Sequence, residues 1–184
     1  KFSKVKNWNQ ENPILYTAVI SIYSNGEVLH TVLQKIGFRT VEVKQRDGIY
    51  VNGVKVKMKG VNRHAFRPET GRTTSKQISI EDVLLMKEMN MNAVRMSHYP
   101  PDDHFLDVCD SLGLFVMDEL AGWHGNYDTK TGTKLLKEMI DHDLNHPSII
   151  FWSNIFPTSS IKCHTHNQFL SRNTSSDMVF NCFF

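Results

Sequence analysis

The sequence predicts an α/β fold in which strands and helices alternate along most of the chain, preceded by a shorter segment made of strands. Between about residues 44 and 155, short apolar stretches of strand type alternate with stretches whose apolar residues recur at helical spacing. Before residue 44, apolar and polar residues alternate with period two, and no helical period is present. We therefore divide the chain into residues 1–43, 44–155 and 156–184.

The N-terminal part, residues 1–43, has the pattern of antiparallel strands. The stretch 16–23 alternates and is rich in β-branched and aromatic residues, and Asn25-Gly26 follows it as a strong hairpin signal. Residues 28–33 and 38–43 are predicted as further strands. Strands joined in this way are typical of the end of an immunoglobulin-like β-sandwich.

The strands of the second part are short and strongly apolar. A hairpin comes first, with its turn at Asn52-Gly53. Continuous apolar runs, which are expected in a parallel sheet, then recur at intervals typical of strand-helix-strand units. The predicted strands after the hairpin are residues 56–60, 93–96, 114–117 and 149–152.

Helices are predicted between these strands. Ser79 with Asp82 has the spacing of a capping box, which predicts the start of the first helix. Pro101 and Asp102 are expected to begin the second helix, and Gly113 is expected to end it. An apolar stripe at residues 135, 136, 139 and 140 predicts the third helix.

Polar side chains are concentrated where these strands end. The pattern alone fits either an α/β barrel or a doubly wound sheet, and in both folds the chemistry lies beyond the C-terminal ends of the strands. The candidate functional side chains are therefore those of Asn62, Arg63, His64, Arg95, Ser97, His98, Tyr99, Asp118 and Glu119.

Composition excludes several kinds of partner. The formal charge is +2, and no cluster of basic residues points to nucleic acid or to an anionic membrane surface. No apolar stretch approaches the roughly 20 residues of a membrane span. The chain opens inside a strand-rich segment without an initiator Met, so we expect the native N-terminus to lie upstream. A cytoplasmic and an exported location both stay open.

Several motifs occur in an order that resembles family 2 of the glycoside hydrolases. Residues 92–100, Asn-Ala-Val-Arg-Met-Ser-His-Tyr-Pro, are similar to the first long signature of that family. Residues 59–64, Lys-Gly-Val-Asn-Arg-His, resemble β-galactosidases of the family, and residues 143–153 resemble the start of its second signature. The resemblance implies the N-terminal part of a (β/α)8 TIM barrel, preceded by the last strands of an immunoglobulin-like β-sandwich.

The resemblance also implies a reaction. Members of the family are retaining enzymes, in which one carboxyl group protonates the leaving oxygen and a second attacks the anomeric carbon. The second family signature ends in Asn-Glu, and that Glu is the general acid/base. Here Trp152-Ser153-Asn154 is followed by Ile155, and the nucleophilic Glu of the family comes from a later strand. We therefore expect a β-galactosidase-like hydrolase by family, but an inactive chain.

The remaining site residues have supporting roles by resemblance. Arg95 would orient the nucleophile and keep it ionised, although it could also be an ion-pair residue of the barrel interior. His64 and His98 would bind sugar hydroxyls, with Asn62 close by. Asp118 and Glu119 could face the substrate, bind a metal or cap the next loop.

Two residues after Glu119 carry further expectations. Trp123 could stack against a sugar face or cover the barrel mouth. Some β-galactosidases place a magnesium-binding Glu and His in this region, which makes His124 a weak metal candidate. The segment here is one residue shorter, and His124 lacks the carboxylates that a hard cation prefers. Magnesium is therefore a cofactor that the resemblance allows but that this segment disfavours.

Alternatives to the enzyme remain. The chain could be a non-catalytic fragment that binds carbohydrate, or a non-functional product in which residues 156–184 are an unrelated, disordered tail read from a shifted frame. The expected ligand is a β-galactoside or a related saccharide, and β-glucuronidase and β-mannosidase stay open as specificities. Full-length relatives could be homo-oligomers.

Overall fold

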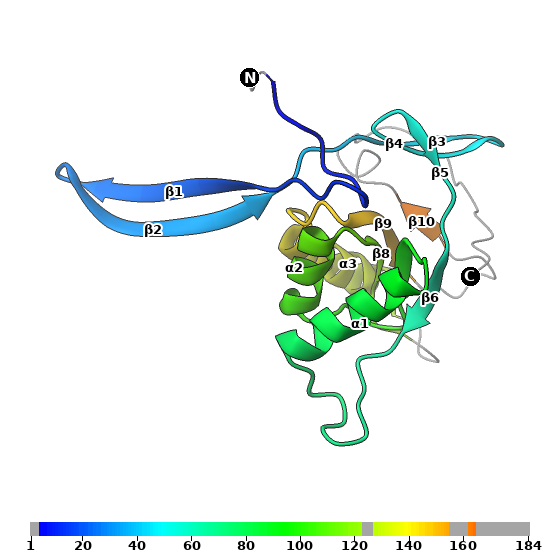
Figure 1. The fold of residues 1–184 in the computed structure, drawn as a ribbon. Coiled ribbons are helices and arrows are strands. Elements are labelled where there is room, and N and C mark those ends of the chain that lie inside the picture. Colours follow the sequence, from blue (N-terminus) through cyan, green and yellow to red (C-terminus); the bar gives the residue numbers. More distant parts are fainter. Residues whose placement is uncertain (1–3, 123–126, 155–161, 165–184) are drawn as a thin grey trace.

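The computed structural model describes residues 4–122, 127–154 and 162–164. They form a two-stranded hairpin, a three-stranded antiparallel meander and a five-stranded sheet that is accompanied by three helices (Figure 1). The elements are β1 (Tyr16–Ser24), β2 (Glu27–Ile36), β3 (Val41–Lys44), β4 (Gly48–Val51), β5 (Val54–Val56), β6 (Gly60–Arg63), α1 (Lys76–Glu88), β7 (Ala93–Met96), α2 (Asp103–Leu112), β8 (Phe115–Glu119), α3 (Thr129–Asp143), β9 (Ile149–Asn154) and β10 (Lys162–His164).

The hairpin of β1 and β2 extends away from the rest of the molecule (Figure 1). Its ladder runs from the pair Tyr16↔Ile36 to the pair Ser24↔Glu27. The predicted turn at Asn25-Gly26 is present, and both residues have positive φ, 50° and 86°. This conformation suits the twist of a tight hairpin, and Asn and Gly tolerate it better than other residues.

The meander of β3, β4 and β5 follows the hairpin. Val41 of β3 pairs with Val51 of β4, and Ile49 of β4 pairs with Val56 of β5. β3 therefore pairs with a strand, β4, that lies beyond the predicted boundary at residue 43. The division of the chain into three parts at residues 43 and 155 stays a prediction.

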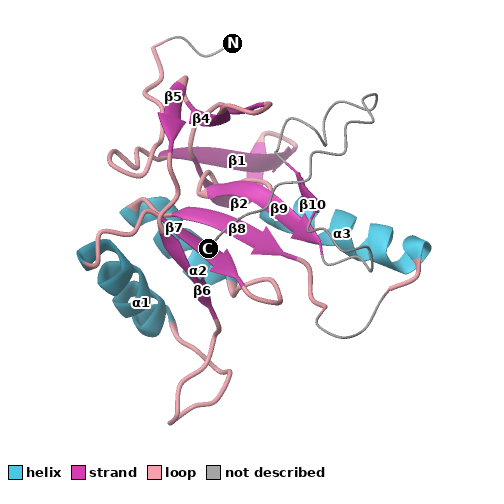
Figure 2. Cartoon of the chain, turned by 90° about the vertical axis from the view of Figure 1, so that its right-hand side faces the viewer, coloured by secondary structure: helices cyan, strands magenta, loops and turns pink. Residues whose placement is uncertain are grey.

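The large sheet has the order β10-β9-β8-β7-β6, and its four strands β6 to β9 are parallel and follow chain order. Helices α1, α2 and α3 lie on one side of it (Figure 2). Parallel neighbours joined in sequence through helices are the repeating unit of a (β/α) barrel. The predicted fold class, part of such a barrel preceded by sandwich strands, is confirmed.

β10 was not expected from the sequence. Its backbone pairs antiparallel with β9, from Lys162↔Asn154 to His164↔Trp152, within the stretch that was predicted to be unrelated to the fold. The rest of residues 155–184 lies outside the described residues, so the expectation of a disordered tail is not addressed by the structure.

Two clusters of buried side chains lie on opposite faces of the sheet. Alternate residues of β7 and β8, such as Val94 and Val116, pack with the apolar sides of the three helices. The intervening residues, such as Phe115 and Met117, pack with Trp8, which is fully buried, and with the meander. Side chains alternate between faces along a strand. Arg95 and Glu119 therefore lie on the same face of the sheet as this second cluster, since each is two residues from a member of it.

The start of α1 differs from the sequence-based expectation. The helix begins at Lys76, and its N-cap is Ser75, whose side chain accepts a hydrogen bond from the backbone of Ile78. Ser79, the predicted cap, is fully buried within the helix, and its hydroxyl lies 2.9 Å from Nδ1 of His104. Asp82, the other half of the predicted capping box, pairs with arginines instead.

Within the described residues, no helix combines the length and apolarity needed to span a membrane.

Candidate functional site

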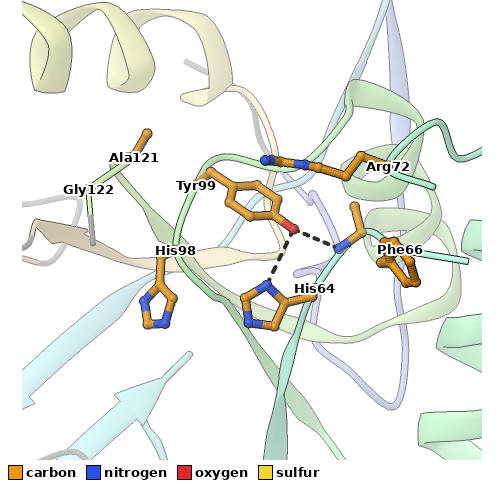
Figure 3. A pocket seen from close by; sticks show the side chains of 8 residues that line it. His64, Phe66, Arg72, His98, Tyr99, Ala121 and Gly122 are labelled. Carbon is orange, nitrogen blue, oxygen red and sulfur yellow. Dashed lines mark hydrogen bonds between the residues drawn. The ribbon is translucent and has the colours of Figure 1, made fainter. Parts of the chain in front are cut away.

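A pocket of about 590 Å³ opens at the C-terminal ends of β6, β7 and β8. Its walls are the loops that follow these three strands, and Figure 3 shows how the aromatic rings and the guanidinium group surround it. The position agrees with the expectation that chemistry lies where parallel strands end. The lining residues are His64, Ala65, Phe66, Arg72, His98, Tyr99, Ala121 and Gly122.

Two histidines and a tyrosine form the polar wall of the pocket. The rings of His64 and His98 are 5.7 Å apart, and the ring of His64 is 5.9 Å from that of Tyr99 (Figure 3). The Tyr99 hydroxyl accepts a hydrogen bond from the backbone of Ala65 at 3.1 Å and lies 3.4 Å from Nδ1 of His64. These contacts tie the loop after β6 to the loop after β7.

Arg95 and Glu119 form an ion pair behind this wall. Arg95 Nε donates to Glu119 Oε2 at 2.7 Å, and Arg95 Nη2 donates to Oε1 at 3.1 Å. His98 Nδ1 lies 3.1 Å from the same Oε1. The Glu119 side chain has no exposed surface, whereas those of Arg95 and His98 are 14% and 25% exposed.

The structure thus brings together most of the residues named from sequence. Asn62 is exposed and pairs in the strand register with Arg95, and both lie within β6 and β7 rather than beyond their ends. Because they occupy equivalent positions on adjacent parallel strands, their side chains leave the same face of the sheet. Trp123 and His124 lie outside the described residues.

Arg63 and Asp118, which were also noted at strand ends, point to the other face of the sheet. Arg63 pairs with Asp82 of α1 at 2.9 Å, and its guanidinium carbon lies 4.0 Å from the centre of the Phe105 ring. Asp118 is fully buried. Both serve the packing of helices on the sheet.

Sequence reasoning did not single out Arg72 and Phe66. They come from the loop between β6 and α1, and the Arg72 guanidinium carbon lies 4.0 Å from the centre of the Tyr99 ring. The length of this loop, from residue 64 to residue 75, could have indicated its involvement, because loops after barrel strands build the site.

The described lining residues of the pocket do not fit a magnesium ion. None of its described lining residues is a carboxylate, and both oxygens of Glu119 already accept hydrogen bonds. Two groups that could hold a metal occur elsewhere among the described residues, Asp103–His142–Asp143 and Asp107–Asp110–His146. Their histidines are already engaged with the neighbouring carboxylates at 2.7 Å and 2.6 Å.

Fold and site together define a protein of the (β/α)-barrel class with a polar pocket at the C-terminal face. Two family models match the chain: "Glycosyl hydrolases family 2, TIM barrel domain" over residues 41–166 and "Glycosyl hydrolases family 2" over residues 1–39. The chain belongs to family 2 of the glycosyl hydrolases.

Similar proteins of known sequence carry two kinds of name. A β-galactosidase of Thermoanaerobacterium thermosulfurigenes is 41% identical over 152 residues, which are 80% of this chain and 21% of that protein. A putative β-glucuronidase of Formosa agariphila is 40% identical over 159 residues, 83% of this chain and 19% of that protein. The chain thus spans about a fifth of the length of these relatives.

Solved structures of the family have the same fold. A β-glucuronidase of Parabacteroides merdae matches with a TM-score of 0.76 and 26% identity, over 83% of this chain and 20% of that one. A glycosyl hydrolase family 2 member from Bacteroides cellulosilyticus matches with a TM-score of 0.73 and 32% identity, over 82% of this chain and 20% of that one.

Proposed function

We propose that this chain carries part of the sugar-binding site of a retaining β-glycosidase of the β-galactosidase type, which hydrolyses O-glycosyl bonds. The observation that supports the proposal is the pocket lined by His64, His98 and Tyr99, with Arg95 held behind it. Imidazole and phenol groups can exchange hydrogen bonds with sugar hydroxyls, and flat rings can pack on the apolar face of a pyranose. Asn62 and Trp123 are proposed as further contacts.

We further propose that the 184-residue chain binds sugar without hydrolysing it. Retaining hydrolysis requires two carboxyl groups about 5–5.5 Å apart. No carboxylate is among the described lining residues, and Ile155 rather than a Glu follows Asn154. The groups that remain can position a sugar and stabilise charge, but they cannot attack the anomeric carbon or protonate the leaving oxygen.

The test compares binding and turnover in the same preparation. We expect saturable binding of methyl β-D-galactoside with a Kd of about 1 mM, which corresponds to about −4 kcal/mol, and no release of nitrophenol from 4-nitrophenyl β-D-galactoside. His98→Ala should weaken binding, while His30→Ala, on the exposed hairpin, should leave it unchanged. Hydrolysis by the purified chain would contradict the second proposal, and absence of binding would contradict the first.

A β-glucuronide is the second candidate ligand. Arg72 lines the pocket, and within the described part of the chain no carboxylate forms an ion pair with it. A guanidinium group can bind a sugar carboxylate with two parallel hydrogen bonds. If this candidate is right, methyl β-D-glucuronide should bind more tightly than the galactoside, and Arg72→Gln should remove the difference while Arg46→Gln should not.

A further inference from the structure

The Glu119 carboxylate does not reach the pocket, although it lies at the end of a barrel strand. Its side chain is fully buried at the end of β8, and it receives hydrogen bonds from two different segments. Arg95 of β7 donates to both carboxylate oxygens. His98, three residues further along the chain, contacts only one of them, Oε1. A single buried carboxylate thus contacts the two residues that the proposed function needs most.

The contact with Glu119 determines which nitrogen of His98 carries a proton. An ionised carboxylate can only accept hydrogen bonds, so His98 Nδ1 must be the donor at 3.1 Å. In a neutral imidazole, the proton on Nδ1 leaves the lone pair on Nε2. In this tautomer Nε2 of the pocket-lining ring is an acceptor, which suits a sugar hydroxyl that donates.

The same carboxylate restrains Arg95. Two parallel hydrogen bonds from one guanidinium group to one carboxylate restrict both the position and the plane of the group. Removing both charges from water is costly, so such a buried pair contributes little net stability. Its larger effect is on geometry, because neither side chain can turn without breaking a charge-assisted hydrogen bond.

We propose that Glu119 is a positioning residue for sugar binding, which holds the Nδ1–H tautomer of His98 and the orientation of Arg95 without touching the sugar. This assignment replaces the substrate-facing role expected for Glu119. The identity of the ligand, a sugar, rests on the proposed function. It requires that the state of the His98 ring, and not only the stability of the fold, responds to a change at position 119.

The first experiment needs no substitution. In the 184-residue chain labelled with ¹⁵N-histidine, the neutral form of the His98 ring should show a proton bound to Nδ1 and none on Nε2. A ring with its proton on Nε2 would overturn the proposal, because Nδ1 could then not donate to Glu119. This readout involves no sugar, so it stands or fails independently of the proposed function.

The second experiment uses variants of the same chain. Glu119→Gln should shift His98 towards a mixture of tautomers and weaken binding of methyl β-D-galactoside on the order of tenfold, the effect of losing one hydrogen bond to a charged group. Glu138→Gln, an exposed change on α3, should alter neither quantity. An unchanged tautomer and an unchanged affinity in a folded Glu119→Gln protein would contradict the proposal.

A third variant separates positioning from folding. Glu119→Asp keeps the charge opposite Arg95, so the guanidinium group stays compensated, but its shorter side chain cannot satisfy both partners. We expect a folded protein, judged from the amide spectrum, in which the His98 tautomer is mixed and galactoside binding is weakened. Wild-type tautomer and affinity in this variant would show that the reach of Glu119 is unimportant and would overturn the proposal.

Discussion

At the scale of single residues, buried polar groups show what sequence patterns can and cannot predict. Ser79 and Asp82 have the spacing of a capping box, yet the helix begins earlier, at Ser75. Asp82 instead forms ion pairs with Arg63 at 2.9 Å and with Arg67 at 2.5 Å. A pattern of four residues contains no information about arginines that approach from a different strand and loop, so tertiary contacts overrule it.

The proximity of the candidate site residues could be predicted, because it follows from the fold, while their roles stay predictions. Parallel strands place their C-terminal ends at one edge, so Arg95, His98 and Glu119 were expected near one another. Which of these side chains lines the pocket, and which lies behind it, could not be predicted in the same way. That Glu119 lies behind His98, rather than in the pocket, depends on side-chain alternation within β8 and on the exact end of that strand.

His146 provides a residue-scale prediction of pH dependence. Burial alone would lower its pKa, but the hydrogen bond with the Asp110 carboxylate at 2.6 Å and nearby negative charges raise it above the ordinary value of 6.5. A raised pKa in the folded state stabilises the fold fully below pH 6.5, and this contribution is lost as the pH rises through the folded-state pKa.

The measurement compares wild type with His146→Gln in urea at two pH values. At pH 5.5 the substitution should cost about 1.5–3 kcal/mol, the range for a hydrogen bond to a charged group. At pH 9.5 the cost should be smaller, because the wild-type ring has lost its proton. His30→Gln, on the exposed hairpin, serves as the control. An equal cost at both pH values would mean that the protonated pair contributes nothing.

At the scale of elements, the strands and helices up to β9 were predicted in type and order, while their ends shifted and β10 was not predicted. The first barrel strand was expected at residues 56–60 but runs over Gly60–Arg63. The cause is the preceding hairpin, since β5 ends at Val56 and a short connection then leads into the sheet. β6 is short and contains only one large apolar residue, Val61, so its composition does not mark where it begins.

The contact between β8 and α3 yields an element-scale prediction. Burial, together with the neighbouring Asp143 carboxylate, raises the pKa of Asp118 well above its ordinary value of 3.8, while His146 acts in the opposite direction. The Asp143 carboxylate also contacts His142 Nδ1 at 2.7 Å. Because the folded-state pKa of Asp118 is raised, the fold loses stability as the pH rises from 3.8 towards that pKa.

Asp118→Asn removes this titration and keeps the acceptor oxygen for the backbone N–H of Glu119. We expect the variant to be more stable than wild type at pH 7 by about 1 kcal/mol, or roughly 3 °C in Tm, and the gain to vanish near pH 3. Asp141→Asn, an exposed change on α3, should show no such trend. A destabilised Asp118→Asn protein at pH 7 would show that the ionised carboxylate is preferred.

At the scale of the whole molecule, the N-terminal segment and the barrel strands share one core. Trp8 donates through Nε1 to the backbone oxygen of Asp110 at 2.7 Å, and its ring meets Phe115 edge-on at 5.9 Å. Arg39 donates to the backbone oxygen of Ile149, and burial lowers the pKa of Arg39 to about 10. The sequence predicted both parts, but periodicity within each part contains no information on how they pack together.

Two glycines allow this packing to be measured. Gly113 and Gly53 both have a φ of 77°, a conformation that costs a residue with a Cβ about 1–2 kcal/mol. A Cβ at Gly113 would lie 2.3 Å from the backbone oxygen of Gln10 in the N-terminal segment, whereas a Cβ at Gly53 would have nothing within 4 Å. The two substitutions therefore share the conformational cost and differ in the steric one.

Gly53→Ala should accordingly lower the free energy of unfolding only by the cost of the positive φ, about 1–2 kcal/mol. Gly113→Ala should lower it by a further 1–3 kcal/mol or so, because Gln10 contributes rigid backbone that can yield only if the N-terminal segment moves away from the barrel. Urea unfolding of the two variants gives the difference directly, and the indole Nε1–H resonance of Trp8, which donates to the backbone oxygen of Asp110, reports whether the segment has shifted. Equal destabilisation by both changes would indicate that the N-terminal segment is not held against the barrel in solution.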